Sequence, residues 1–206
     1  MTSAASKRPG KAVSNGVISE LATFFDVLPG HEQELRAAVQ RFTEAIRNLD
    51  VKDGIRTGLR DTRHVIFDDG LRLLWCTTFE GAWDTHVDDA LLLVGVEQFT
   101  DWLRHTVQGQ QFAVRAALAA EAEKFGWNDP DGEDAMATNS AELKATLQSV
   151  RSQAAAYFNP LGVLPLPRII KAQHLERAFR HLLSKPSAEE VLRHPDLRPL
   201  VQRAAD

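Results

Sequence analysis

Two neighbouring residues of the segment Leu59 to Phe67 have side chains that can do chemistry at neutral pH. The imidazole of His64 titrates near neutrality and can serve as a general base or as a ligand. Arg63 cannot deprotonate, so its role would be to hold an anionic group. Adjacent strand residues point to opposite faces, so at most one of the two lines a given pocket. The alternative is a structural His64, hydrogen-bonded at a dimer interface or at the end of a sheet.

The turn after this segment decides which face His64 occupies. A three-residue loop at Asp68–Gly70 places His64 on the side of Leu74, whereas a two-residue loop places it with Trp75. The sequence leaves both registers open. Trp75 is a candidate substrate-binding residue, because it belongs to a set of aromatic residues that can line a cavity: Phe24, Phe25, Phe67 and Trp75.

The segment from Trp83 to Asp89 offers an imidazole and three carboxylates: His86, Asp84, Asp88 and Asp89. On a helix, Asp84 and Asp88 share one face and His86 and Asp89 another, so the four cannot meet one ion. Acids in a first helical turn are the usual cap and dipole partners. We therefore expect capping and no metal site. Asp84 and His86 are expected at the mouth of the pocket, where they position a substrate or simply cap.

Three further histidines are candidates for a haem ligand, which needs an apolar pocket: His105, His174 and His181. His174 and His181 lie seven residues apart on one helical stripe, which equally fits histidines at the flank of a core. Cys76 sits in the middle of an expected strand and is interpreted as a small core residue rather than a nucleophile. No glycine-rich phosphate loop or Gly-x-Ser-x-Gly motif is present.

Composition narrows the class of protein. The 206 residues carry a net charge of -4 with a pI near 6.0, which argues against a general nucleic-acid binder. No apolar run is long enough for a membrane span, and no apolar core follows the basic residues near the start as a secretory signal requires. A single cysteine forms no intrachain disulfide, so we expect a reducing, cytoplasmic location.

Strands and helices alternate in the first hundred residues. Alternating apolar residues predict a strand at Leu21–Val27, and three- and four-residue spacing predicts a helix at His31–Leu49. Two extended runs, Leu59 to Phe67 and Leu71 to Phe79, flank an Asp-Gly turn, which predicts a hairpin. A second helix begins near Trp83. This order is the βαββα start of a ferredoxin-like α+β sheet with helices on one face, which needs a fourth strand to close.

The rest of the chain is less regular. Phe112 to Phe125 is predicted to be helical, and the letters WNDPDGED that follow are predicted to be a loop. Residues 143–158 fit either a helix, by periodicity, or the missing strand, by topology. A helix near Ile169–Leu183 and a short one at Ser187–Leu192 are expected beyond them. We divide the chain into a disordered leader at 1–15, an α+β domain at 16–160 with an acidic helical insertion around 107–142, and a helical extension at 161–206.

Three stretches resemble a group of bacterial proteins in the dimeric α+β barrel superfamily. They read DVLPGHEQELR, RHVIFDDGLRLLWCTTFEGAWDTHVDD and, for the closing strand, QAAAYFNPLG. The likeness covers residues 17–105 well and the remainder loosely. Glu80 stands where an Asp is commoner in the group. The superfamily includes antibiotic monooxygenases, stress-response barrels and dye-decolourising peroxidases, and the peroxidase signature Gly-x-x-Asp-Gly is missing here.

The resemblance implies a protein that binds a small molecule. Because a ferredoxin-like sheet leaves one apolar face uncovered, we expect a homodimer, unless the C-terminal helices cover that face within one chain. One expectation is an oxygenase-like or haem-dependent oxidoreductase acting on a small apolar or redox-active substrate. The alternative is a non-catalytic stress-response or ligand-binding module. Because the helix His31–Leu49 fills one sheet face, we expect the pocket on the opposite face, with His64 as its first catalytic candidate and Arg63 as the replacement if the register shifts.

Overall fold

The computed structural model describes residues 16–124 and 135–205. The chain divides into two compact units, Met1–Leu166 and Pro167–Asp206. The expected leader at 1–15 and the WNDPDGED loop lie outside the described residues. None of the described helices is long and apolar enough to cross a membrane.

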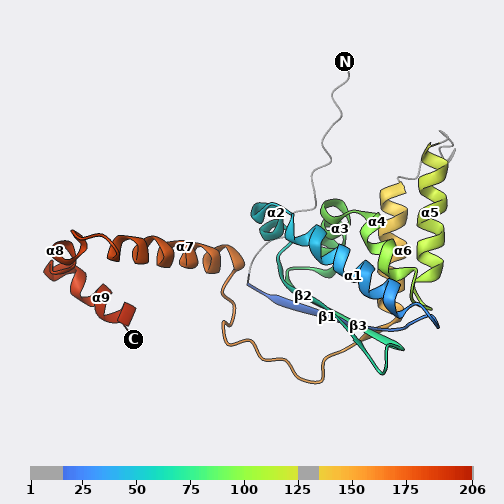
Figure 1. Cartoon of the computed structure of the whole chain (residues 1–206), viewed down its shortest axis with the longest axis horizontal. Coiled ribbons are helices and arrows are strands. Elements are labelled where there is room, and N and C mark those ends of the chain that lie inside the picture. Colours follow the sequence, from blue (N-terminus) through green and yellow to red (C-terminus); the bar gives the residue numbers. More distant parts are fainter. Residues whose placement is uncertain (1–15, 125–134, 206) are drawn as a thin grey trace, which may run out of the picture. The chain divides into compact units, whose positions relative to one another are not determined.

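The first unit is an α+β structure built on a four-stranded antiparallel sheet in the order β2-β3-β1-β4 (Figure 1). Its elements follow one another along the chain as β1 (Ile18–Asp26), α1 (Glu32–Arg47), α2 (Val51–Arg56), β2 (Leu59–Phe67), β3 (Arg72–Glu80), α3 (Trp83–Val94), α4 (Val96–Leu103), α5 (Gln110–Lys124), α6 (Ala135–Ser149) and β4 (Arg151–Ser152). The expected strand, helix and hairpin of residues 17–80 are confirmed. The one-turn helix α2 was not expected.

One face of the sheet is covered by helices. Leu21, Thr23 and Phe25 of β1 are buried on this face, and α1 contributes Leu35, Ala38 and Phe42 to the same core. In Figure 1, α1, α3 and α4 lie on this side of the sheet. The other face carries the alternate residues of the strands, including Phe24 and Leu74, which are half-buried. We call it the open face.

The fourth strand is much shorter than topology suggests. Helix α6 continues to Ser149, and only Arg151 and Ser152 pair with β1, opposite Thr23 and Ala22. The periodicity of residues 143–158 therefore predicted the helix correctly, and the expected strand over 149–158 is mostly absent. Residues 153–165 form neither helix nor strand, and in Figure 1 they run on the side of the sheet away from α1.

The second unit is helical, with α7 (Leu166–Leu183) beginning at its boundary, followed by α8 (Ala188–Leu192), a 3-10 turn (Pro195–Leu197) and α9 (Arg198–Ala205). Both helices expected after residue 166 are present. Helix α7 has no buried residue, and Leu175, Leu182 and Leu183 are all exposed.

Candidate functional site

His64 lies on the helix-covered face, so its expected position on the open face is wrong. It pairs with Trp75 across the hairpin, and four residues, Asp68 to Leu71, separate the paired strand ends. An even number of turn residues preserves the register of the two-residue alternative, which puts His64 beside Trp75 rather than Leu74. Glycine at the third turn position has a φ of 91°, which suits the Asp-Gly signal.

Aromatic rings enclose the His64 imidazole. Its ring centroid lies 5.1 Å from that of Trp102, 5.3 Å from Phe42 and 6.0 Å from Trp75. Burial lowers the pKa of His64 to about 3, so the imidazole is neutral at physiological pH. Its Nε2 is among the few buried side-chain atoms of the described residues with no hydrogen-bond partner. The residue as a whole is half-buried, but a general base must reach its substrate with a ring nitrogen, and Nε2 is buried against these rings.

Trp75 shares this core with His64 rather than facing a pocket on the open side. Its side chain is 5% exposed, and the indole Nε1 donates a hydrogen bond to Thr62 Oγ1 at 2.9 Å. The two sequence candidates are thus brought together, but inside the packed layer between sheet and helices. This position is that of a structural aromatic pair.

Arg63 occupies the open face, as the shifted register requires. It is exposed and stands opposite Cys76 on β3. Burial raises the pKa of the Cys76 thiol, and a hydrogen bond from Arg63 acts in the opposite direction. Glu20 and Asp61 also act electrostatically on this thiol. The middle of the open face therefore carries one guanidinium group among carboxylates and a protonated thiol.

A second guanidinium group lies at the hairpin end of the same face. Arg72 Cζ is 5.9 Å from the ring centroid of Phe24 and 5.3 Å from that of Phe67, within cation-π range. Val65, on the same strand face as Arg63, is 41% exposed. The open face thus combines half-buried apolar side chains with two arginines and with the carboxylates of Glu20 and Asp61. The two guanidinium groups are the part of this face that can hold an anionic group beside an apolar body.

Asp84 and His86 do not join either arrangement. Asp84 is largely exposed and lies 3.4 Å from Lys144 Nζ, which is also 2.9 Å from Asp88. The N-cap of α3 is Ala82 and has no side-chain cap bond, so the expected capping is wrong. Asp84 does lie in the first turn, where its charge suits the helix dipole as expected. Asp84 and Asp88 instead tie α3 to α6 through Lys144.

His86 is a buried residue at the other end of the sheet. Its ring stacks on Phe79 with centroids 3.9 Å apart, and its Nδ1 lies 3.0 Å from the carbonyl oxygen of Thr57. Burial lowers the pKa of His86 to about 4, against a smaller opposing effect of the Thr57 hydrogen bond. The ring is neutral and packed between α3 and the sheet, so its expected place at a pocket mouth is not what the structure shows.

The haem candidates do not fit an axial ligand in an apolar pocket. His174 and His181 on α7 are exposed. His105 is only partly buried, and its Nδ1 faces Nδ1 of His31 at 2.9 Å. Burial and the neighbouring His31 lower the pKa of His105. The three haem candidates are therefore either exposed to solvent or in contact with another imidazole.

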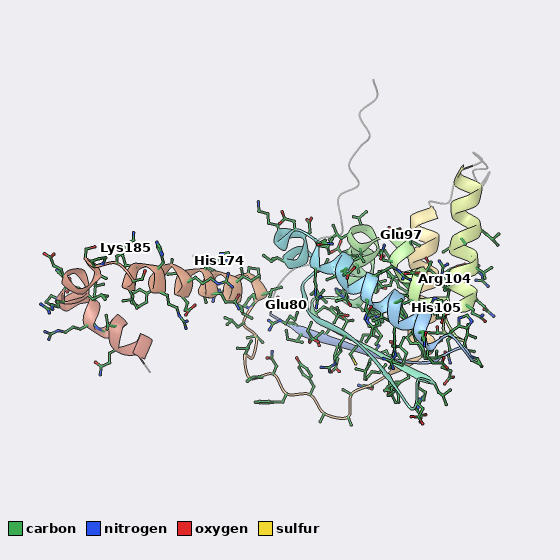
Figure 2. The ribbon with its side chains drawn as sticks, viewed as in Figure 1. Glu80, Glu97, Arg104, His105, His174 and Lys185 are labelled. Atoms are coloured by element: carbon green, nitrogen blue, oxygen red, sulfur yellow. The ribbon has the colours of Figure 1, made fainter. Side chains whose placement is uncertain are left out.

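Glu80 has a structural role that was not predicted from its sequence context. Its side chain is fully buried at the end of β3, where it accepts hydrogen bonds from Arg60 and from the backbone N–H groups of Gly16 and Leu166. Figure 2 shows Glu80 at this end of the sheet. The available signal was a carboxylate ending an otherwise apolar strand, which has to find partners when buried.

A shallow surface pocket of about 480 Å³ lies between α1 and α4, lined by Arg41, Glu44, Ala45, Glu97, Gln98, Asp101 and Arg104. Within it Arg41 Nε donates to Asp101 at 2.8 Å. Both acidic and basic side chains line this pocket, so it does not present a surface of a single charge sign to a ligand.

Comparisons with protein families, with curated proteins and with solved structures found no match to this chain.

Proposed function

We propose that this protein binds a small molecule with an anionic group and an apolar body on the open face of its sheet. The observation that carries the proposal is the position of Arg63 opposite Cys76, on a face whose neighbouring side chains Phe24, Leu74 and Phe67 are apolar. Arg63 holds the anion, since a guanidinium offers paired donors to a carboxylate. The apolar body lies along the strands toward Arg72.

Binding without catalysis is the form of this function that we favour. The imidazole expected to move protons, His64, lies on the other face and packs against Phe42, Trp75 and Trp102. The Cys76 thiol on the open face has a raised pKa and is a poor nucleophile. An oxidoreductase would have to place its chemistry on another group, so the ligand-binding module is better supported.

The experiment uses octanoate and benzoate as probes, with thermal unfolding and NMR titration as readouts. We expect either carboxylate to raise the melting temperature of the full chain, because a ligand that binds only the folded state stabilises it. Arg63→Ala should abolish the shift. Arg36→Ala removes another exposed arginine, on α1, and is the matched control that keeps the shift. An equal response of both variants would exclude Arg63 as the anion site.

We also infer a ferredoxin-like sheet that pairs with a second copy through its open face. The order β2-β3-β1-β4 places β3 and β1 in the centre, and the helices lie on one side, which supports this topology. An apolar face left without helices is expected to be covered by a symmetric partner. Two such faces would enclose the ligand between them.

Light scattering at micromolar concentration tests the pairing. We expect a dimer mass for the full chain and a monomer mass for Val65→Asp, which places a carboxylate on the open face. Val114→Asp on α5 is the control, since Val114 is also exposed but lies away from the sheet. A monomer mass for the unchanged chain would contradict the inference.

A further inference from the structure

His31 and His105 face each other although they are 74 positions apart in the sequence. Their Nδ1 atoms are 2.9 Å apart, and the ring centroids are separated by 5.2 Å with the planes inclined by 56°. Two imidazole nitrogens at this distance share a single proton, so at least one of them directs a lone pair at the other. Neutral imidazole nitrogen is the preferred protein ligand of late first-row transition metals.

The backbone holds the two histidines in place. His31 immediately precedes α1, and His105 follows α4. The segments are joined by a hydrogen bond from Leu28 N to the carbonyl oxygen of His105 at 3.0 Å, and by one from Val107 N to Asp26 O at 2.8 Å. Val27 and Thr106 form a bridge between them. A pair of ligands fixed in this way pays little conformational entropy when an ion binds.

The distance between the two Nδ1 atoms is close to the distance between two nitrogen ligands of one zinc ion. Two nitrogens at about 2.0–2.1 Å from a tetrahedral zinc are about 3.3 Å apart. The observed 2.9 Å therefore has to widen by only a few tenths of an ångström, a change that rotation of either ring supplies. The side chains are partly buried rather than sealed in a core, so an ion can reach them.

The charged groups near the pair are of both signs. Glu34 on α1 and Asp101 on α4 interact electrostatically with His105 as negative groups, and Arg104 does so as a positive one. Asp101 already binds Arg41, and the N-terminus of α1 opposes a cation at His31. With Arg41 counted, two carboxylates face two guanidinium groups, so the surroundings of the pair carry little net charge. Figure 2 labels Arg104 and His105 at the end of α4.

We propose that His31 and His105 form a site for a divalent transition-metal ion such as Zn²⁺, bound by the two Nδ1 atoms and completed by water. Among the described residues, no group of three or more His, Cys, Asp or Glu side chains is arranged to hold a metal ion. The site therefore supplies two protein ligands. Water would fill the remaining positions, so the site is open, unlike a structural zinc site closed by four protein ligands.

Zinc titration of the full chain, stripped of metal with a chelator, tests the proposal. We expect isothermal calorimetry near neutral pH to show one ion bound per chain, and the affinity to fall by on the order of tenfold or more in His31→Ala and in His105→Ala. His174→Ala removes an exposed histidine of α7 and is the matched control, whose affinity should equal that of the unchanged chain. Unchanged affinity in either of the first two variants would overturn the site.

NMR of the histidine side chains in the unchanged chain gives a second measurement that no folding defect can disturb. Zinc should shift the imidazole nitrogen signals of His31 and His105 before those of the other histidines. If zinc shifts other histidines first, or shifts none, the pair is a hydrogen bond and the proposal is wrong. Neither readout involves Arg63 or a carboxylate ligand, so the outcome is independent of the proposed function.

Discussion

Arg60 and Glu80 form an ion pair at the end of the sheet, with Arg60 Nη2 2.6 Å from Glu80 Oε1. Only 12% of the arginine side chain and none of the glutamate side chain is exposed. The same Glu80 oxygen accepts the N–H of Leu166, and the other accepts the N–H of Gly16. Arg60 also donates to the carbonyl oxygen of Leu164. The pair thus fastens the segment before β1 and the end of the segment after β4 to the same point.

Removing the Glu80 carboxylate should be costly. Glu80→Ala leaves Arg60 with a buried charge and two backbone N–H groups without their acceptor, so we expect a loss of about 3–5 kcal/mol in the free energy of unfolding. Urea denaturation measures it. Glu142→Ala breaks the exposed pair of Glu142 with Arg115 and should cost less than about 1 kcal/mol. Equal losses of free energy in the two variants would mean that the buried Arg60–Glu80 pair stabilises the fold no more than an exposed pair does.

Two glycines in the turn region before β2 should respond in opposite directions to alanine. Gly58 has a φ of +68°, and a Cβ there would lie 2.7 Å from the carbonyl oxygen of Glu80. Gly58→Ala should therefore destabilise by about 1–2 kcal/mol for the left-handed backbone alone, and more for the clash. Gly54 lies in α2 with nothing within 4 Å of a Cβ, so Gly54→Ala should stabilise by about 0.5–1 kcal/mol. Thermal unfolding measures both effects: the melting temperature should fall in Gly58→Ala and rise in Gly54→Ala.

Local pattern predicted most of the sheet and the first helix, because each depends on residues near one another in sequence. Apolar alternation in β1, three- and four-residue spacing in α1 and the Asp-Gly turn all match the structure. The face of His64 depended on one residue of turn length, and a shift of one exchanges the two faces of a strand. The sequence therefore placed His64 and Arg63 on opposite faces without deciding which was which.

Contacts between residues that are distant in the sequence could not be predicted from local patterns. Nothing local indicates that Glu80 meets Gly16 and Leu166, or that His31 meets His105, since these contacts arise only once the strands and helices pack. The acids of α3 were interpreted as caps, whereas Lys144 on α6 binds Asp84 and Asp88 across a helix interface. The expected positions of His64 and His86 in a pocket also depended on such packing, and the structure places both elsewhere.

The indole of Trp75 depends on a single acceptor. Thr62→Val keeps the size of the side chain but removes the oxygen that accepts from Trp75 Nε1, so a buried N–H loses its partner. We expect a loss of about 1–3 kcal/mol. Thr43→Val is the control, because the Thr43 hydroxyl only donates to the Val39 carbonyl oxygen within α1. Urea denaturation showing no difference between the variants would contradict the role of Thr62.

Acid should destabilise the first unit through His64 and His86, whose pKa values are lowered by burial of their rings. The pKa of His64 is lowered to about 3 and that of His86 to about 4, from about 6.5 in an unfolded chain. Between these values the unfolded state binds more protons than the folded state. Stability is therefore full above about pH 6.5 and falls as the pH drops toward 4 and then 3.

The size of this effect distinguishes the histidines. Each contributes up to about 1.4 kcal/mol per pH unit, so lowering the pH from about 7 to about 5 should cost roughly 2 kcal/mol for each of them. His64→Leu should remove about half of that pH dependence while keeping the fold, because leucine fills an aromatic pocket that gives His64 Nε2 no partner. His181→Leu, which replaces an exposed imidazole, is the control. Urea denaturation at the two pH values measures both. If His64→Leu retains the full pH dependence, folding does not lower the pKa of His64, and the aromatic surroundings do not govern its charge.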